Sequence, residues 1–161
     1  MKYLLLLFLV LAANCFCTAQ LVVQVYDGDT YKILNAGKLQ VIRLANVDAP
    51  ELNQYFGIVV KHSVSKLILG KVVEADFFGT DRYGRTIANL KVNGQSLDSL
   101  LLVNGLAWNY LSYTGGNLQL SFYESLAKTS KAGMWKCLYN VPPWIWRHLD
   151  KRQKRLHEMC R

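Results

Sequence analysis

The chain has 161 residues, 52% of them hydrophobic, and a formal net charge of +8 at pH 7. This length fits one domain with a substantial core, and the sequence has no internal repeat and no low-complexity linker. None of the four cysteines follows the CxxC or Cys/His spacing of a zinc site, which argues against a structural zinc ion.

The first 19 residues have the pattern of a secretory signal peptide. One basic residue, Lys2, precedes an apolar run over residues 4–13, and small residues follow up to Ala19. The apolar run is about half the length needed to cross a bilayer. We therefore expect cleavage after Ala19 and an exported protein, secreted or periplasmic, with no stable membrane association. A lipoprotein acylated at Cys15 or Cys17 is the less favoured alternative.

Cleavage at that position would leave two cysteines in the mature chain, Cys137 and Cys160. An even pair in an oxidising compartment suggests a disulfide. The alternative is two unpaired thiols, because sequence alone contains no geometry.

The N-terminal part of the mature chain predicts a three-stranded meander. Residues 21–26 and 30–34 are β-branched and aromatic runs, separated by Asp27-Gly28-Asp29. This spacing predicts a tight hairpin in which glycine supplies a positive φ angle and aspartate bonds to nearby backbone. Residues 39–47 predict the third strand.

The remaining elements alternate between helical and strand patterns. Residues 71–78 and 86–92 alternate like two strands around a turn. Three segments have helical spacing or helix boundaries, namely 56–69, 96–103 and 118–131. Five short strands with a helix inserted after the third predict an α+β fold, a five-stranded Greek-key barrel of the oligonucleotide-binding (OB) type with three α-helices.

Acidic residues and arginines fall into three short clusters. The clusters are Asp27-Gly28-Asp29-Thr30, Arg43 with Asp48-Ala49-Pro50-Glu51, and Asp81-Arg82-Tyr83-Gly84-Arg85. Carboxylates suit a divalent cation such as calcium, and planar guanidinium groups suit bidentate binding of phosphate oxygens. Taken one at a time, the clusters are better explained as turns or loops. If the fold brings them together, they have the groups needed to cut a phosphodiester.

Phosphodiester hydrolysis requires neutralised phosphate oxygens, an aligned water and a group that takes the proton of that water. One cation with Arg43 and Arg85 meets the first requirement. Glu51 is the one carboxylate of its cluster that is not needed as a direct ligand, so it is the candidate base. Tyr83 and Tyr113 could stack on a sugar or a base, or could equally belong to the edge of the barrel.

Four motifs in order resemble the staphylococcal (micrococcal) nuclease family over roughly residues 22–135. The motifs are DGDT at 27–30, RLANVDAPE at 43–51, DRYGR at 81–85 and NGLAW at 104–108. The resemblance implies a calcium-dependent endo- and exonuclease on an OB-type barrel, which leaves 3′-phosphate ends. Its substrates would be single-stranded DNA, RNA and, less readily, duplex DNA.

Carried over by position, the resemblance implies that Asp29 and Asp48 bind Ca²⁺ through their carboxylates and Ala49 through its backbone carbonyl. Asp27 and Thr30 would support these ligands. Position 49 is often threonine in the family, and because its ligand is a backbone carbonyl, calcium binding should survive the alanine found here.

The resemblance further implies that Arg43 and Arg85 hold the scissile phosphate, while Glu51 orients or deprotonates the attacking water. The residues that would line the nucleotide pocket are Asp81, Arg82, Tyr83 and Tyr113. We expect residues 20–136 to form the nuclease domain and the protein to be a monomer.

Residues 137–161 form a C-terminal extension that contains prolines and tryptophans and ends in a basic stretch. Residues 147–161 alone hold six basic and two acidic residues. We expect Trp144 or Trp146 to pack on the barrel and the basic tail to lie near nucleic acid. The alternative is a solvated, partly disordered end.

Two other functions compete with a nuclease. The first is a non-catalytic single-stranded nucleic-acid-binding module on the same barrel, which would lack some of the ligands or arginines. The second is a cationic membrane-surface protein, which would need an amphipathic basic helix that residues 151–161 barely supply. All ligands and arginines are present, so the sequence favours the nuclease.

Overall fold

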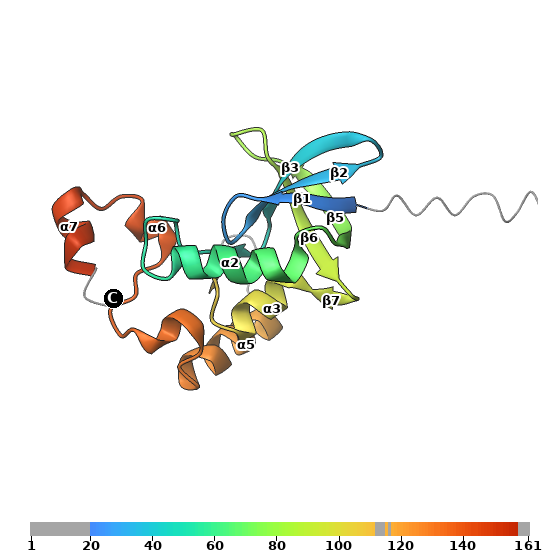
Figure 1. Ribbon diagram of the computed structural model, residues 1–161. Coiled ribbons are helices and arrows are strands. Elements are labelled where there is room, and N and C mark those ends of the chain that lie inside the picture. Colours follow the sequence, from blue (N-terminus) through green and yellow to red (C-terminus); the bar gives the residue numbers. More distant parts are fainter. Residues whose placement is uncertain (1–19, 112–114, 116, 158–161) are drawn as a thin grey trace, which may run out of the picture.

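The computed structural model describes residues 20–111, 115 and 117–157 (Figure 1). The segment predicted as a signal peptide lies outside the described residues, as do Tyr113 and Cys160. Cleavage and export therefore stay predictions. Along the described part of the chain, no helix combines the length and apolar character needed to cross a membrane.

Five strands close into a barrel, which confirms the predicted fold class (Figure 1). These strands are β1 (Gln20–Val25), β2 (Thr30–Asn35), β3 (Lys38–Leu44), β5 (Val72–Thr80) and β6 (Thr86–Val92). The first three form an antiparallel meander, and β5 pairs antiparallel with both β1 and β6. Parallel pairing of β3 with β6 closes the barrel and covers edges that an open sheet would expose. The short β7 (Gln95–Ser96) turns back and pairs antiparallel with the end of β6.

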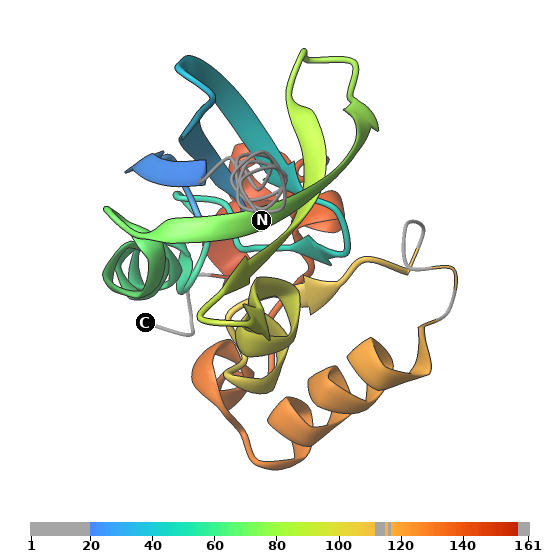
Figure 2. The same ribbon diagram turned by 90° about the vertical axis from the view of Figure 1, so that its right-hand side faces the viewer.

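Three main helices follow the predicted positions closely: α2 (Gly57–Ile68), α3 (Leu97–Val103) and α5 (Leu118–Thr129). The side chain of Ser96 accepts a hydrogen bond at the start of α3, and that of Asn117 accepts two at the start of α5. Each cap satisfies backbone N–H groups that have no partner within the helix. Figure 2 shows α3 and α5 together on one side of the barrel.

The third predicted strand, over residues 39–47, is interrupted. β3 ends at Leu44, whose N–H donates to the carbonyl of Asp29 at 2.9 Å. After a bend, β4 (Val47–Asp48) pairs antiparallel with β8 (Trp108–Asn109). The prediction of one continuous strand is wrong because the chain changes partners at this point. A long-range change of partner leaves no mark in the local apolar pattern.

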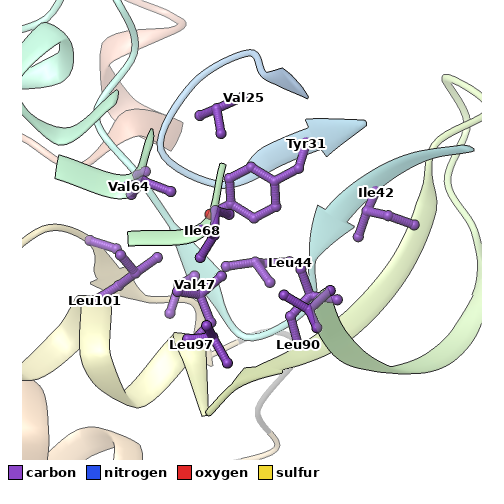
Figure 3. Packing of buried hydrophobic residues seen from close by; sticks show 14 of the residues in the cluster. Val25, Tyr31, Ile42, Leu44, Val47, Val64, Ile68, Leu90, Leu97 and Leu101 are labelled. Carbon is purple, nitrogen blue, oxygen red and sulfur yellow. The ribbon is translucent and has the colours of Figure 1, made fainter. Parts of the chain in front are cut away.

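The core fills the barrel and the space between the barrel and the helices α2 and α3 (Figure 3). Residues from both layers meet there, among them Tyr31, Ile42, Leu90, Ile68 and Leu101, each at most 1% exposed. The hydroxyl of Tyr31 donates to the carbonyl of Gly28 at 2.6 Å, so the one polar atom of this side chain is satisfied. The same bond fixes the β1–β2 turn to the core.

Gly28 is required in that turn for a reason other than the predicted one. Its φ is not among the positive φ angles of the described residues, so the predicted positive φ is wrong. A Cβ at this position would lie 2.5 Å from the Cβ of Ala49 and 2.6 Å from Cγ1 of Val60. The absence of a side chain therefore lets the turn pack directly against the loop after β4 and against α2.

A 3₁₀ turn, η2 (Gly133–Lys136), leads into the C-terminal extension, which contains two short helices, α6 (Pro143–Trp146) and α7 (Lys151–Leu156). Trp146 is 4% exposed, which confirms that a tryptophan of the extension packs on the domain. α7 begins with a capping box between Asp150 and Gln153. The end of the chain is therefore helical up to residue 157, although α7 has no buried residue, as the alternative of a solvated end predicts.

Cys137 is disulfide-bonded. The other three cysteines lie outside the described residues, so pairing with Cys160 stays a prediction. A contact of 3.3 Å between the ring Nδ1 of His157 and the carbonyl of Tyr139 brings the end of α7 close to Cys137. This proximity supports the predicted pair.

Asp98, in the first turn of α3, is a buried carboxyl with few partners. It is 2% exposed and accepts one hydrogen bond, from Nδ2 of Asn46 at 2.8 Å. Its Oδ1 atom has no hydrogen-bond partner within the described residues. Burial raises the pKa of Asp98 to about 6, although the bond from Asn46 opposes this rise.

Gly28→Ala should destabilise the fold because the added methyl group enters space held by Ala49 and Val60. Overpacking of this kind costs about 1–3 kcal/mol of the free energy of unfolding, measured by urea denaturation. Val60→Ala and the double variant Gly28→Ala/Val60→Ala complete a double-mutant cycle. Since Val60→Ala removes one of the two clashing groups, the double variant should lose less than the sum of the single losses. Strict additivity would contradict the predicted clash.

The raised pKa of Asp98 makes stability depend on pH. Between the unfolded value of 3.8 and the folded value of about 6, the folded protein binds the proton more tightly, so the free energy of unfolding decreases as pH rises. The decrease attributable to Asp98 is about 3 kcal/mol. Urea unfolding across this pH range should show a smaller decrease in Asp98→Asn. A decrease of the same size in the variant would assign the titration to another group.

Candidate active site

The three clusters that the sequence singled out line one open cavity of about 910 Å³. They reach it from the β1–β2 turn, from β3 and the loop after β4, and from the β5–β6 hairpin. The predicted site residues that line this cavity are Asp27, Asp29, Arg43, Asp48, Ala49, Glu51, Asp81, Arg82, Tyr83 and Arg85. Tyr113 lies outside the described residues, so its predicted role is untested.

Asp29 connects the first cluster to the second. The turn before it is held by Asp27, whose Oδ1 accepts the N–H groups of Asp29 and Thr30 at 3.0 and 2.7 Å. Asp29 is buried, and its Oδ2 accepts the N–H of Ala49 at 2.6 Å. Its Oδ1 accepts the hydroxyl of Thr30 at 3.0 Å. Asp27 and Thr30 thus support Asp29, as predicted for them.

The guanidinium of Arg43 lies between the two predicted metal-binding carboxylates. Its Nε is 3.2 Å from Oδ1 of Asp29, and its Nη2 donates to Oδ1 of Asp48 at 2.9 Å. Its Nη1 donates to the carbonyls of Leu44 and Val47, each at 2.7 Å, and so spans the bend between β3 and β4. Burial alone lowers the pKa of Arg43, but the charges of the two carboxylates outweigh burial and raise it.

Negative charge is concentrated in this corner of the cavity. Burial and the charge of Asp29 raise the pKa of Asp48, against the influence of the neighbouring arginines. Burial and the charge of Asp29 likewise raise the pKa of Asp27 to about 6. Carboxylates whose ionised forms disfavour one another gain stability from an additional cation nearby. The electrostatics of the corner therefore fit a metal ion.

A calcium ion is also compatible with the donor atoms present. The carboxylates of Asp29 and Asp48 both contact Arg43 and thus lie beside one another, and Ala49 follows Asp48 directly. Calcium accepts carboxylates, backbone carbonyls and several waters. No group of three or more His, Cys, Asp and Glu side chains in the described residues could hold a metal ion. Waters and the carbonyl of Ala49 would therefore have to supply the remaining ligands.

Arg85 is held at the cavity by its own turn. Oδ1 of Asp81 accepts the N–H groups of Tyr83 and Arg85, and Oδ2 accepts Nε of Arg85 at 2.8 Å. Nη1 of Arg85 is 3.4 Å from the hydroxyl of Thr30, which links the third cluster to the first. Because both oxygens of Asp81 are used within the turn, its contacts favour positioning of Arg85 over direct contact with a nucleotide.

Arg82 and Tyr83 form the exposed wall of the cavity. The ring of Tyr83 is 69% exposed, and the guanidinium carbons of Arg82 and Arg85 lie 4.9 and 5.5 Å from its centroid. An exposed aromatic ring with two arginines beside it offers a surface for a base or sugar. Both residues thus line the cavity, and their contact with a nucleotide stays a prediction.

Glu51 lies at the rim of the cavity and contacts a residue that sequence analysis did not assign to the site. Nε of Arg147 donates to Oε1 of Glu51 at 2.6 Å, and Nη2 of the same side chain donates to Oδ1 of Asp48 at 2.7 Å. In the sequence, Arg147 is one of six basic residues in the tail. Nothing in the local pattern distinguishes it from the other five.

Tyr110 is a second residue of the cavity that sequence analysis missed. Its ring centroid lies 5.8 Å from that of Trp144 in the extension. The extension therefore meets the cavity through an aromatic contact as well as through Arg147.

Comparison with known proteins agrees with this arrangement. Residues 41–137 match the family described as "Staphylococcal nuclease homologue". An "Uncharacterized endonuclease" of Escherichia coli O157:H7 is 37% identical over 128 residues, which cover 79% of this chain and 83% of that protein. An "Uncharacterized endonuclease" of Haemophilus influenzae is 35% identical over 153 residues, covering 92% and 84%. The "Micrococcal nuclease" of Shigella flexneri is 31% identical over 140 residues, covering 81% and 80%.

The family match spans more than half of the chain, and the matched relatives are covered over most of their own length. The barrel, the cavity and its three clusters of acids and arginines are consistent with this match. The chain therefore belongs to the staphylococcal nuclease family.

Proposed function

We propose that this protein is a calcium-dependent phosphodiesterase that hydrolyses DNA and RNA with little sugar or sequence specificity and leaves 3′-phosphate ends. The observation that carries the proposal is the convergence of three carboxylates and two arginines in one cavity: Asp29, Asp48, Glu51, Arg43 and Arg85. Family membership and the printed names of the relatives support the nuclease activity. The predicted signal peptide supports a role outside the cytoplasm, in the periplasm or the medium.

The carboxylates differ in burial in a way that suits different roles. The side chain of Asp48 is 2% exposed, whereas that of Glu51 is 36% exposed. A buried carboxylate beside Asp29 suits a metal ligand, because the charge of the ion compensates for the water that burial has removed. Glu51, at the solvent side, can hydrogen-bond a water molecule and accept its proton. Calcium, if held by Asp29, Asp48 and the carbonyl of Ala49, would polarise the phosphate.

The two arginines also differ. All three nitrogens of Arg43 bond to protein oxygens, and its side chain is 13% exposed. Arg85 is 30% exposed, and within the described residues its Nη2 makes no hydrogen bond. Arg85 is therefore the better placed of the two to bind a phosphate oxygen directly. Arg43 serves first to hold Asp29 and Asp48 together.

A single digestion experiment tests the proposed activity. Single-stranded DNA should be cut with calcium and left intact with a calcium chelator. Arg85→Ala should lower kcat/KM by roughly 10²–10³-fold, because it removes charge stabilisation from the transition state. Arg85→Lys, which keeps the charge without the planar fork, should fall between the two.

Lys91→Ala is a matched control, because it removes one exposed positive charge from β6 outside the cavity. Its activity should equal that of the wild type. Calcium-independent cutting, or full activity of Arg85→Ala, would overturn the site assignment. Tight binding of DNA without cleavage under all conditions would support the non-catalytic module.

The basic helix α7 should contribute to nucleic-acid binding. The basic residues Lys151, Arg152 and Arg155 are exposed. Nζ of Lys154 lies 5.4 Å from the ring of Trp146, so Lys154 is kept unchanged in the variant. Binding of single-stranded DNA weakens as salt rises, so log K plotted against log salt has a negative slope. Replacing the three exposed residues by Gln should make this slope less steep by up to about 2, at about 0.7 per lost phosphate contact.

Binding for this comparison is measured with a chelator present, so that the DNA stays intact. A variant with Lys38, Lys91 and Lys136 replaced by Gln loses the same charge elsewhere and should keep more of the slope. Equal slopes for the wild type and the α7 variant would show that α7 makes no phosphate contacts.

A further inference from the structure

The C-terminal extension docks on the loop that carries Glu51. The indole Nε1 of Trp146 donates to Oδ1 of Asn53 at 3.0 Å, and Nε2 of Gln54 donates to the carbonyl of Val141. Trp146 itself is 4% exposed. Figure 1 shows α6 beside the segment that leads into α2. The extension is therefore fixed against this loop by a buried aromatic side chain and by hydrogen bonds from both sides.

Arg147 directly follows the buried Trp146, and docking of the extension therefore places Arg147 in the cavity. The guanidinium divides its contacts between two functional carboxylates. Nε binds Oε1 of Glu51 at 2.6 Å, and Nη2 binds Oδ1 of Asp48 at 2.7 Å. These are short, charge-assisted hydrogen bonds, which belong to the stronger polar contacts in proteins. Burial opposes the charge on Arg147, but its bonds to Asp48 and Glu51 outweigh burial and raise its pKa.

The contact with Glu51 affects how this carboxylate is oriented. Arg147 is the one side-chain partner of the Glu51 carboxylate among the described residues. A glutamate at 36% exposure with no such partner would sample several rotamers. The bond to Arg147 restricts Glu51 to a position beside Asp48.

The contact with Asp48 concerns a carboxylate that is also a proposed calcium ligand. Oδ1 of Asp48 accepts from both Arg43 and Arg147. A calcium ion bound by this oxygen would lie close to the Arg147 guanidinium, and two like charges at that separation repel each other. Calcium and the Nη2 group of Arg147 would thus compete for the same carboxylate. The Nε bond to Glu51 does not involve that oxygen.

We propose that Arg147 is a positioning residue of the active site, which holds Glu51 beside Asp48 and competes with calcium for Asp48. Docking of the extension is thereby coupled to metal binding. Because such coupling is reciprocal, calcium weakens the contact between Arg147 and Asp48 by the same factor by which that contact weakens calcium binding. This inference rests on the proposed calcium-dependent function.

The test measures calcium affinity by titration calorimetry in the absence of nucleic acid. Arg147→Ala should bind calcium roughly tenfold more tightly than the wild type, within the usual range of coupling between two ligands. Arg147→Lys keeps a positive charge near Asp48 and should stay close to the wild type. Lys136→Ala, which removes an exposed charge at the end of η2, just before the extension, controls for the loss of net charge.

The direction of the change separates competition from damage to the fold. A variant that merely loosens the loop would bind calcium more weakly, whereas the loss of a competitor strengthens binding. At saturating calcium, kcat of Arg147→Ala on a short single-stranded DNA should fall about tenfold with little change in KM, because Glu51 is no longer held. Lys136→Ala should keep the wild-type kcat.

Each outcome decides between the proposals. Equal or weaker calcium binding by Arg147→Ala, with a wild type that binds calcium and cuts DNA, would overturn the competition and leave the nuclease function standing. Tighter binding with an unchanged kcat would overturn the positioning of Glu51. A wild type that neither binds calcium nor cuts DNA would overturn both this inference and the proposed function.

Discussion

The arrangement of the cavity depends on the buried guanidinium of Arg43. This group bonds to Asp29 and Asp48 and also closes the bend between β3 and β4 through the carbonyls of Leu44 and Val47. Without it, Asp29 would lose its guanidinium partner and Asp48 would keep only Arg147, and breaking buried ion pairs in this way is strongly destabilising. One residue thus determines both the path of the backbone and the spacing of the candidate metal ligands.

Around this centre the protein holds more negative charge than packing alone would tolerate. The pKa values of Asp27 and Asp48 are raised because burial and repulsion by Asp29 both disfavour the ionised forms. Such local conflict is expected where function, rather than stability, selects the residues. Arg147 of the extension neutralises part of this negative charge through its ion pairs with Asp48 and Glu51. The C-terminal segment is therefore a structural part of the site.

Much of the fold could be predicted from local patterns, because hairpins and helices are encoded over short stretches of chain. The positions of α2, α3 and α5 follow from apolar periodicity and from helix boundary signals such as Ser96. The pairing of β4 with β8 could not be predicted, since it joins segments far apart in the sequence. The role of Gly28 was also hidden, because its close neighbours Ala49 and Val60 meet it only in the folded chain.

The candidate site divides in the same way. The sequence alone determined the chemistry: which acids and arginines are available, and their order in motifs typical of one nuclease family. Only the tertiary structure decided that Asp81 holds Arg85 in place, that Arg43 bridges two carboxylates, and that Arg147 reaches Glu51 from the far end of the chain. The physical reason is that a side chain's partners depend on packing between distant segments. The local sequence of a basic tail does not show whether its arginines face solvent or contact a carboxylate.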